Sequence, residues 1–192
     1  MKTNIRKLSV TAMLAAVSSV LMFVNFAVPM FMPPFIKVDF SELPALLGSF
    51  ALGPFYGVLV SLIKNLINLP FSTTGGVGEL SNFIISSSFV FFAGLIYSKL
   101  KNRRGALIGS VLGALIAALI SVFTNFYITY PFYTKFMSMD AIIGMYQALN
   151  SNVDNLIEAL IYFNLPFTFV KCMCSVVISF VIYKKISPIL KG

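Results

Sequence analysis

Long apolar runs separated by short charged clusters are the feature of this sequence that most limits its possible folds. Hydrophobic residues make up 58% of the 192 positions and charged residues only 10%, whereas a soluble globular domain carries about 25% charged residues. So few charges cannot cover the surface of a water-soluble protein. The composition therefore predicts an integral membrane protein, with a single transmembrane substrate-binding domain over residues 1–192.

The charged residues also separate by sign along the chain. Lys and Arg are retained on the cytoplasmic side of short membrane loops, so basic clusters predict cytoplasmic segments. The net charge of +8 is then explained by orientation and by contact with anionic lipid in the bilayer, and no nucleic acid partner is expected. The basic clusters are Lys2/Arg6/Lys7, Lys99/Lys101/Arg103/Arg104 and Lys184/Lys185/Lys191, and the acidic stretches are Asp39/Glu42, Glu79 and Asp140/Asp154/Glu158.

The apolar runs between these clusters predict an all-α, integral membrane six-helix bundle. A helix of about 20 apolar residues spans a hydrocarbon core of about 30 Å. With the basic clusters inside, both termini are cytoplasmic and the protein is a multi-pass protein of the cell membrane. The expected helices are Leu8–Val28, Leu43–Leu52, Phe55–Leu69, Phe83–Leu100, Gly105–Tyr127 and Leu156–Tyr183.

The stretch from Leu43 to Gly78 is the part whose path is least determined. It must begin and end outside, which allows zero or two passes. Gly53-Pro54 divides it, because proline is badly placed inside a helix. The two resulting helices reach only about 15 and 23 Å at 1.5 Å per residue. They either cross a thinned membrane or dip in and return.

Polar side chains inside apolar runs are expensive and therefore point to function. Lys64 and Asn68 are four residues apart and share a helix face. Asn164, Thr168 and Lys171 follow the i, i+4, i+7 pattern of one face. With Asn125 and the loop that ends at Glu79, these clusters all lie toward the outer leaflet. Their amides, ammonium groups and nearby aromatic rings suit a flat aromatic ligand with a polar edge and a hydroxylated tail.

Each of these clusters also has a purely structural interpretation. Lys64 can extend its ammonium to the lipid headgroups, and Asn125 can join two helices. The nearby tyrosines, including Tyr130, can form an interfacial aromatic belt. The stripes Ala12/Ala16 and Gly105/Gly109/Gly113 fit either packing within the bundle or docking of a partner membrane protein. Lys171 is harder to explain structurally, because an unpaired buried ammonium needs a partner or a polar cavity.

Catalysis and metal binding have little support in the sequence. The chain has no histidine, no nucleophile–base set and no nucleotide-binding G-x-x-x-x-G-K-[ST] motif. Cys172 and Cys174 point to different faces of a helix and are interpreted as packing residues. We therefore expect no enzymatic activity, no metal and no cofactor.

A series of short motifs, spread over nearly the whole chain, gives a more specific indication. In this order and spacing the chain resembles the substrate-capture subunits, or S components, of energy-coupling-factor vitamin importers, most closely their riboflavin-specific branch. The motifs are Val38–Leu46, Ala51-Leu52-Gly53-Pro54 with Gly57, Lys64-Asn65-Leu66-Ile67-Asn68, Gly75–Glu79 with Asn82-Phe83, Asn125-Phe126 with Pro131-Phe132-Tyr133, and Pro166-Phe167 with Lys171.

The resemblance implies a six-helix bundle that binds a vitamin near its external face, under the long first loop. It implies docking to a membrane coupling subunit and two ATP-binding-cassette ATPases, with Ala12 and Ala16 contacting the membrane partner. It also implies that Asn125 and Lys171 contact the ligand. Where the riboflavin branch usually has an asparagine, this chain has Thr168, and Asn164 is a possible substitute one turn earlier.

We therefore predict a membrane-embedded riboflavin-binding S component, with riboflavin as transported ligand and partner ATPases supplying the energy. The alternatives are an S component for a different vitamin or related small molecule, and, from another class, a stand-alone channel or facilitated carrier. The expected substrate-binding residues are Asn125, Lys171, Thr168, Asn164, Lys64, Asn68, Glu79, Phe40 and Tyr130.

Overall fold

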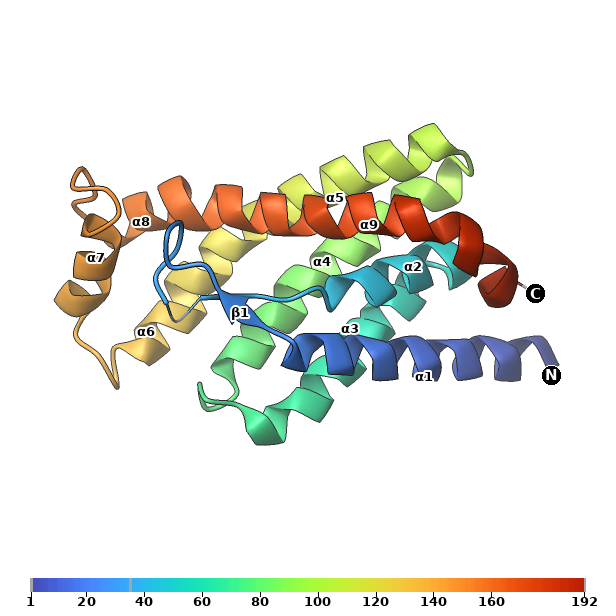
Figure 1. Cartoon of the computed structure of the whole chain (residues 1–192), viewed down its shortest axis with the longest axis horizontal. Helices are drawn as coiled ribbons and strands as arrows, with labels where there is room; N and C mark the ends of the chain where they lie inside the picture. Colours follow the sequence, from blue (N-terminus) through green and yellow to red (C-terminus); the bar gives the residue numbers. More distant parts are fainter. Residues whose placement is uncertain (1, 35, 192) are drawn as a thin grey trace.

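The computed structural model describes residues 2–34 and 36–191, with side chains described for residues 4–34 and 36–182. The chain is mostly helical, and the one sheet among the described residues is a pair of two-residue strands (Figure 1). The elements are α1 (Lys2–Phe23), β1 (Phe26–Ala27), β2 (Lys37–Val38), α2 (Glu42–Leu52), α3 (Pro54–Asn68), the 3₁₀ turn η1 (Leu69–Phe71), α4 (Val77–Lys99), α5 (Arg103–Thr124), the π-helical turn η2 (Asn125–Thr129), α6 (Tyr130–Tyr133), α7 (Met139–Gln147), α8 (Leu156–Ala159), the π-helical turn η3 (Leu160–Asn164) and α9 (Leu165–Lys191).

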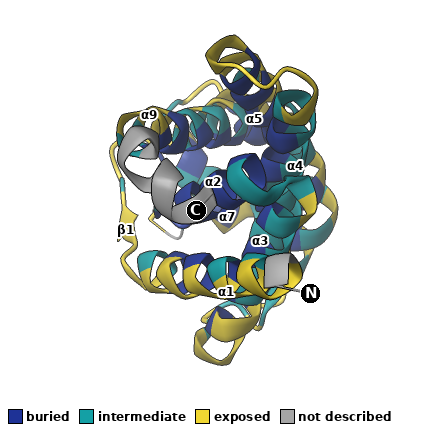
Figure 2. Ribbon diagram, turned by 90° about the vertical axis from the view of Figure 1, so that its right-hand side faces the viewer, coloured by how far each residue is buried: buried dark blue, intermediate teal, exposed yellow. Residues whose placement is uncertain are grey.

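The short helix α2 lies at the centre of the bundle. It packs against α1, α3, α4 and α9 (Figure 2), and every residue from Glu42 to Phe50 is buried. The predicted break at Gly53-Pro54 is confirmed: Gly53 has φ 121°, a conformation that glycine tolerates, and Pro54 begins α3. Because α2 is enclosed by protein, its limited length exposes no backbone to lipid.

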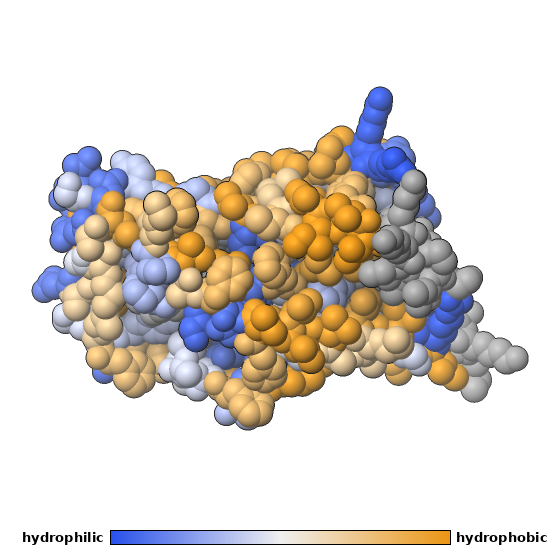
Figure 3. Space-filling model, viewed as in Figure 1, coloured by the Kyte–Doolittle hydropathy of each residue, from blue (hydrophilic) through white to orange (hydrophobic). Residues whose placement is uncertain are grey.

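The outer faces of the helices are apolar, as a lipid-facing surface requires. Within the described residues, five helices are long and apolar enough to cross a membrane, and Glu42–Leu52 is a shorter apolar helix. Large hydrophobic side chains such as Val17, Phe123 and Val177 are more than half exposed. Hydrophobic side chains cover much of the middle of the molecule in Figure 3, and hydrophilic ones gather at the end that carries α7. This arrangement fits a protein whose solvent is lipid along its middle.

Both chain ends and the basic connection between α4 and α5 lie at the same end of the molecule (Figure 1). The separation of charges predicted that these segments share one side of the membrane, and their common end agrees with that part of the prediction. The side chains of Lys2, Lys184, Lys185 and Lys191, which belong to that prediction, lie outside the described side chains.

Several element boundaries differ from those expected. α1 stops at Phe23 instead of Val28, because Phe26 and Ala27 pair with Val38 and Lys37 in an antiparallel hairpin. The expected third helix extends through η1 into an 18-residue apolar segment, Pro54–Phe71. α4 begins earlier, at Val77, directly after two glycines with positive φ.

The segment after α6 contains a helix, α7, that the sequence did not predict. The side chain of Ser138 caps it by accepting a hydrogen bond from the backbone N–H of Ala141 at 3.2 Å. Ile142 and Tyr146 are its buried residues. The helix therefore packs onto the bundle through one face.

The glycine stripe of α5 is a packing surface inside the bundle. A Cβ on Gly109 would lie 2.6 Å from the carbonyl oxygen of Ala93, and one on Gly113 would lie 2.7 Å from that of Phe89. The absence of side chains at these positions therefore lets α5 approach α4 closely. Of the two interpretations of this stripe, the structure supports packing within the bundle.

Candidate functional site

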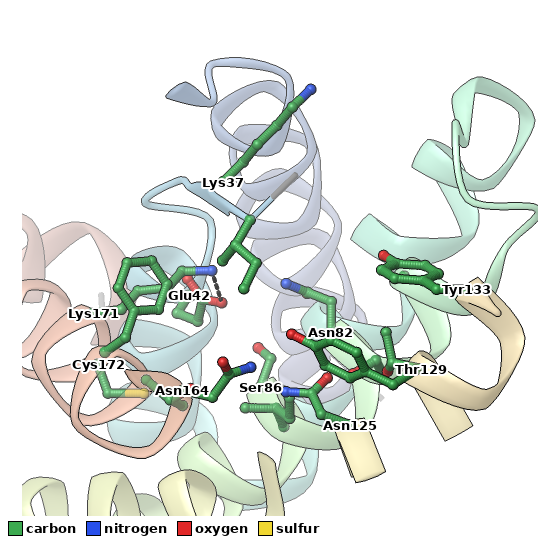
Figure 4. Close-up of a pocket in the computed structure, with 17 residues that line it drawn as sticks. Lys37, Glu42, Asn82, Ser86, Asn125, Thr129, Tyr133, Asn164, Lys171 and Cys172 are labelled. Carbon is green, nitrogen blue, oxygen red and sulfur yellow. Dashed lines mark ion pairs between the residues drawn. The ribbon is translucent and has the colours of Figure 1, made fainter. Parts of the chain in front are cut away.

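A cavity of about 170 Å³ lies where the loop before α2, the start of α4 and the π-helical turns meet (Figure 4). The loop contributes Ile36 and Lys37, and α2 contributes Glu42. The remaining walls come from α4, η2, α6, η3 and α9. The cavity therefore brings together segments from nearly the whole length of the chain.

Each of the two π-helical turns provides one asparagine to the cavity. Asn125 opens η2, in the continuation of α5, and Asn164 closes η3, just before α9. A π-helical turn inserts an extra residue into a helix and is frequent at functional sites. Figure 4 shows Asn82, Asn125 and Asn164 facing the middle of the cavity from different walls. Three amide groups, each with donors and acceptors, thus face one volume.

Lys171 lines the cavity from α9, about two turns after Asn164, and is paired with two carboxylates. Its Nζ lies 3.0 Å from Oδ2 of Asp39 and 3.1 Å from Oε1 of Glu42. The pairing joins α9 to the loop before α2 across 132 positions of the chain. The partner that the sequence required for Lys171 is therefore this pair of acids, and both lie just outside or at the start of α2.

Lys64 extends the same charge cluster into the protein interior. It is fully buried, with its Nζ 3.7 Å from Oε1 of Glu42, and it donates a hydrogen bond of 2.5 Å to the Ser41 hydroxyl. The Ser41 hydroxyl in turn donates to the carboxylate of Asp39. Two ammonium groups thus face two carboxylates, and the cluster is close to neutral, which reduces the cost of burying it.

The pKa of Asp39, which lies in the loop outside the spanning helices, reflects this surrounding. Burial raises the pKa of the carboxyl group, but the nearby ammonium groups of Lys171 and Lys64 lower it. The hydrogen bonds from Ser41 lower it further, and the resulting pKa is about 2. Asp39 is therefore a carboxylate at any physiological pH.

Several buried polar atoms on the cavity wall have no hydrogen-bond partner among the described residues. They are Oε2 of Glu42, Oδ1 of Asn82 and Oγ1 of Thr129. Buried polar atoms are usually paired, so unpaired ones on residues that line a cavity indicate a polar ligand. The rings of Tyr133 and Phe167, from α6 and α9, also line the cavity and supply aromatic surface. The cavity therefore has the groups to bind a molecule that is partly aromatic and partly polar.

Asn164 is held in place by two buried tyrosines. The Tyr146 hydroxyl, from α7, donates to Oδ1 of Asn164 at 2.8 Å. The Tyr130 and Tyr146 hydroxyls also form a hydrogen bond with each other. Burial raises the pKa of Tyr146, which lies outside the spanning helices, and keeps its hydroxyl protonated.

The structure brings five of the predicted substrate-binding residues onto the cavity wall: Asn125, Asn164, Thr168, Lys171 and Tyr130.

The other four lie off the cavity wall. Lys64 lies behind Glu42 in the charge cluster. Asn68 donates to the backbone carbonyl of Lys64 at 2.9 Å. Glu79 accepts a hydrogen bond of 2.6 Å from Ser72, and Phe40 packs its ring against Phe26. In this structure these side chains shape the surroundings of the cavity.

Other lining residues were not singled out from the sequence. Glu42 was noted as part of an acidic stretch and of the motif Val38–Leu46, but not as a binding residue. Ser86 and Thr129 gave no signal beyond being small polar residues in apolar helices. Asn82 lies in a motif that carried the resemblance, one turn from Gly78, so its position was available as a signal. Cys172, interpreted as a packing residue, is buried and also lines the cavity.

The predicted partner-binding residues Ala12 and Ala16 are exposed on α1. Their neighbours Met13, Val17 and Val20 are also more than half exposed. This face of α1 is therefore exposed, whereas the glycine stripe of α5 packs against α4.

No group of three or more His, Cys, Asp or Glu side chains suited to a metal ion lies among the described residues.

Comparison with known proteins gives consistent results over the full chain. Residues 6–183 match the model of the family described as ECF transporter, substrate-specific component. The chain is 31% identical over 186 residues to the riboflavin transporter RibU of Staphylococcus aureus (strain TCH60), covering 97% of this chain and 93% of that protein. It is 29% identical over 188 residues to the riboflavin transporter FmnP of Bacillus subtilis (strain 168), with 96% and 94% coverage.

A solved structure of the S component of a bacterial ECF transporter has the same fold. The TM-score is 0.77 at 27% sequence identity, and the alignment covers 98% of this chain and 99% of that one.

Proposed function

Because the chain belongs to the family of ECF transporter substrate-specific components, we propose that it is the riboflavin-binding S component of a vitamin importer. Two relatives that align over more than nine-tenths of their length are riboflavin transporters. The observation that carries the proposal is the convergence of Asn82, Asn125, Asn164 and Lys171 on one cavity with unpaired polar atoms.

In this proposal the flavin ring system lies among the aromatic and aliphatic side chains of the cavity. Asn125, Thr168 and Lys171 address its polar groups. Asn164 and Tyr130 contribute from η3 and α6, and Asn164 supplies the amide that Thr168 lacks. Lys64, Asn68, Glu79 and Phe40 act indirectly, by holding the charge cluster and the loops around the cavity.

Binding requires the walls to move apart. Sites for drug-sized ligands usually measure about 300–1,000 Å³, and this cavity measures about 170 Å³. Ile36 and Lys37 line the cavity from the loop and the short strand β2 that precede α2, and not from a packed helix. We propose that their displacement makes room for riboflavin.

The proposed architecture is a single domain over residues 1–192 that crosses the cell membrane six times, with both termini in the cytoplasm. The common end of the two termini and the basic α4–α5 connection support this orientation. The protein has no enzymatic activity of its own and no cofactor; riboflavin is its transported ligand. A membrane coupling subunit and two ATP-binding-cassette ATPases supply the energy, and the exposed Ala12 and Ala16 contact the coupling subunit.

The binding experiment is a titration of purified protein with riboflavin, followed by flavin fluorescence. Tight, saturable quenching with a stoichiometry of one riboflavin per chain supports the proposal. Competition by unlabelled biotin, thiamine and folate serves as the specificity control. Absence of quenching, together with tight binding of another vitamin, would identify the protein as an S component for a different substrate.

A stand-alone channel or facilitated carrier is the rival from another class. It required Lys64 and Lys171 to line an anion path, but Lys64 is fully buried and both ammonium groups face carboxylates. Proteoliposomes that contain this chain alone test the point. An S component binds riboflavin without sustained accumulation, whereas a channel gives riboflavin flux without partners or ATP.

A further inference from the structure

The residue that holds Asn164 comes from outside the spanning helices. Tyr146 lies on α7, and its side chain is fully buried. It packs in an apolar cluster with Ile142, Val153 and Leu160. This cluster anchors α7 beside the cavity without contributing Tyr146 to the cavity wall.

The hydrogen bonds of this cluster assign a direction to the Asn164 amide. A tyrosine hydroxyl has one hydrogen, and that of Tyr146 is donated to Oδ1 of Asn164 at 2.8 Å. The hydrogen between the two tyrosines therefore comes from Tyr130. With its oxygen engaged, Asn164 directs its NH₂ group to the cavity side, as Figure 4 shows. One of the two NH₂ hydrogens meets the Tyr130 hydroxyl, and the other is left for a ligand.

Rotating the amide by half a turn is opposed by the same groups. It would place the NH₂ of Asn164 against the Tyr146 hydroxyl, so that the hydrogen bonds of both tyrosines would have to reverse at the same time. The surrounding side chains are apolar, and in such surroundings a hydrogen bond is stronger and an unpaired polar group is costlier. The tyrosines thus tie the orientation of the amide to their own hydrogen bonds, so that the amide cannot turn alone.

We propose that Tyr146 is a positioning residue for ligand recognition: it holds Asn164 as a hydrogen-bond donor toward the cavity, so that the site selects a ligand with an acceptor at that place. The inference rests on the proposed function, since flavin ring carbonyls and ring nitrogens are acceptors of this kind. It assigns to α7 a part in specificity, although α7 itself contributes no residue to the cavity wall.

The test is a double-mutant cycle for riboflavin binding, with Tyr146→Phe, Asn164→Leu and the double variant. Tyr146→Phe keeps the ring and its packing but removes the hydroxyl. We expect it to weaken riboflavin binding roughly 5-fold, the effect of about one hydrogen bond. In the Asn164→Leu background the same change should have almost no further effect, because the amide it positions is absent. Tyr162→Phe is the matched control, since Tyr162 lies in η3 and is 58% exposed.

Asn164→Asp separates positioning from a purely structural role. It keeps an oxygen that accepts from Tyr146 and replaces the cavity-facing NH₂ with an acceptor. We expect a loss of affinity at least as large as that of Asn164→Leu. Binding at wild-type affinity would overturn the inference, as would a Tyr146→Phe effect that persists unchanged in the Asn164→Leu background. Wild-type protein that fails to bind riboflavin would instead overturn the proposed function, and the inference with it.

Discussion

The charge cluster around Lys171 makes a quantitative prediction about stability. Lys171, Asp39 and Glu42 have side chains that are only 14%, 8% and 5% exposed, and Lys64 is the second cation. Lys171→Met leaves two buried carboxylates facing one ammonium group. Removing one partner of a buried ion pair typically costs about 3–5 kcal/mol. We therefore expect Lys171→Met to lower the free energy of unfolding by about that amount.

The effect is measured by thermal unfolding in detergent. For a chain of this size about 2–4 °C is lost per kcal/mol, which gives a decrease in Tm of roughly 6–20 °C. The double variant Lys171→Met/Glu42→Gln restores one cation to one carboxylate, so it should regain at least about half of the loss. Lys101→Met, at an exposed position, is the control and should change stability by less than about 0.5 kcal/mol.

The reasoning would be refuted by a double variant that is less stable than Lys171→Met alone. That result would mean that Glu42 stabilises the fold through contacts other than its pairing with Lys171.

Three further predictions concern other parts of the molecule. Gly113→Leu should lower the free energy of unfolding by about 1–3 kcal/mol, because its Cβ would collide with a backbone carbonyl of α4. Gly144→Ala is the control: a Cβ there meets nothing within 4 Å, and the variant should raise the free energy of unfolding by up to about 1 kcal/mol. The pKa of Asp39 is lowered to about 2, so the contribution of its charge to stability should be complete above the ordinary pKa of about 3.8 and should be lost as the pH falls toward 2. Asp39→Asn should therefore flatten the acid limb of a curve of Tm against pH. Replacing both Ala12 and Ala16 with Leu should leave Tm and riboflavin affinity close to wild type, because both residues are exposed. The same double variant should no longer co-purify with the coupling subunit. Retained co-purification would show that this face of α1 is not the docking surface.

Much of the fold could be predicted from the sequence, because features such as helix breaks depend on the chemistry of a few neighbouring residues. The break at Gly53-Pro54 followed from proline alone, and the structure confirms it. The family was predicted from motifs in their order along the chain, and the full-length matches confirm it. The unpredicted features depend on pairings that a linear pattern does not reveal, as when the Phe26–Ala27 pairing with Lys37–Val38 shortens α1.

The site was predictable by residue type but not by pairing. The sequence indicated that Lys171 needs a partner, but Asp39 lies 132 positions away, and only the folded chain brings the two together. Asn68, in contrast, has a local partner. Its side chain donates a hydrogen bond to the backbone carbonyl of Lys64, four residues earlier, as short polar side chains in helices often bond to nearby backbone. The π-helical turns that contain Asn125 and Asn164 interrupt the regular spacing of an α-helix, so helical periodicity did not predict them.

The most direct test of the central claim compares riboflavin binding by the wild-type protein and by Asn125→Leu, using flavin fluorescence quenching. Asn125 enters the cavity from η2 and faces the middle of it (Figure 4). Loss of hydrogen bonds from one amide, with an apolar group left against the polar edge of the ligand, should weaken binding roughly 10-fold or more. The wild-type protein should bind one riboflavin per chain tightly. Equal affinities for the two proteins would contradict the claim that this cavity is the riboflavin site.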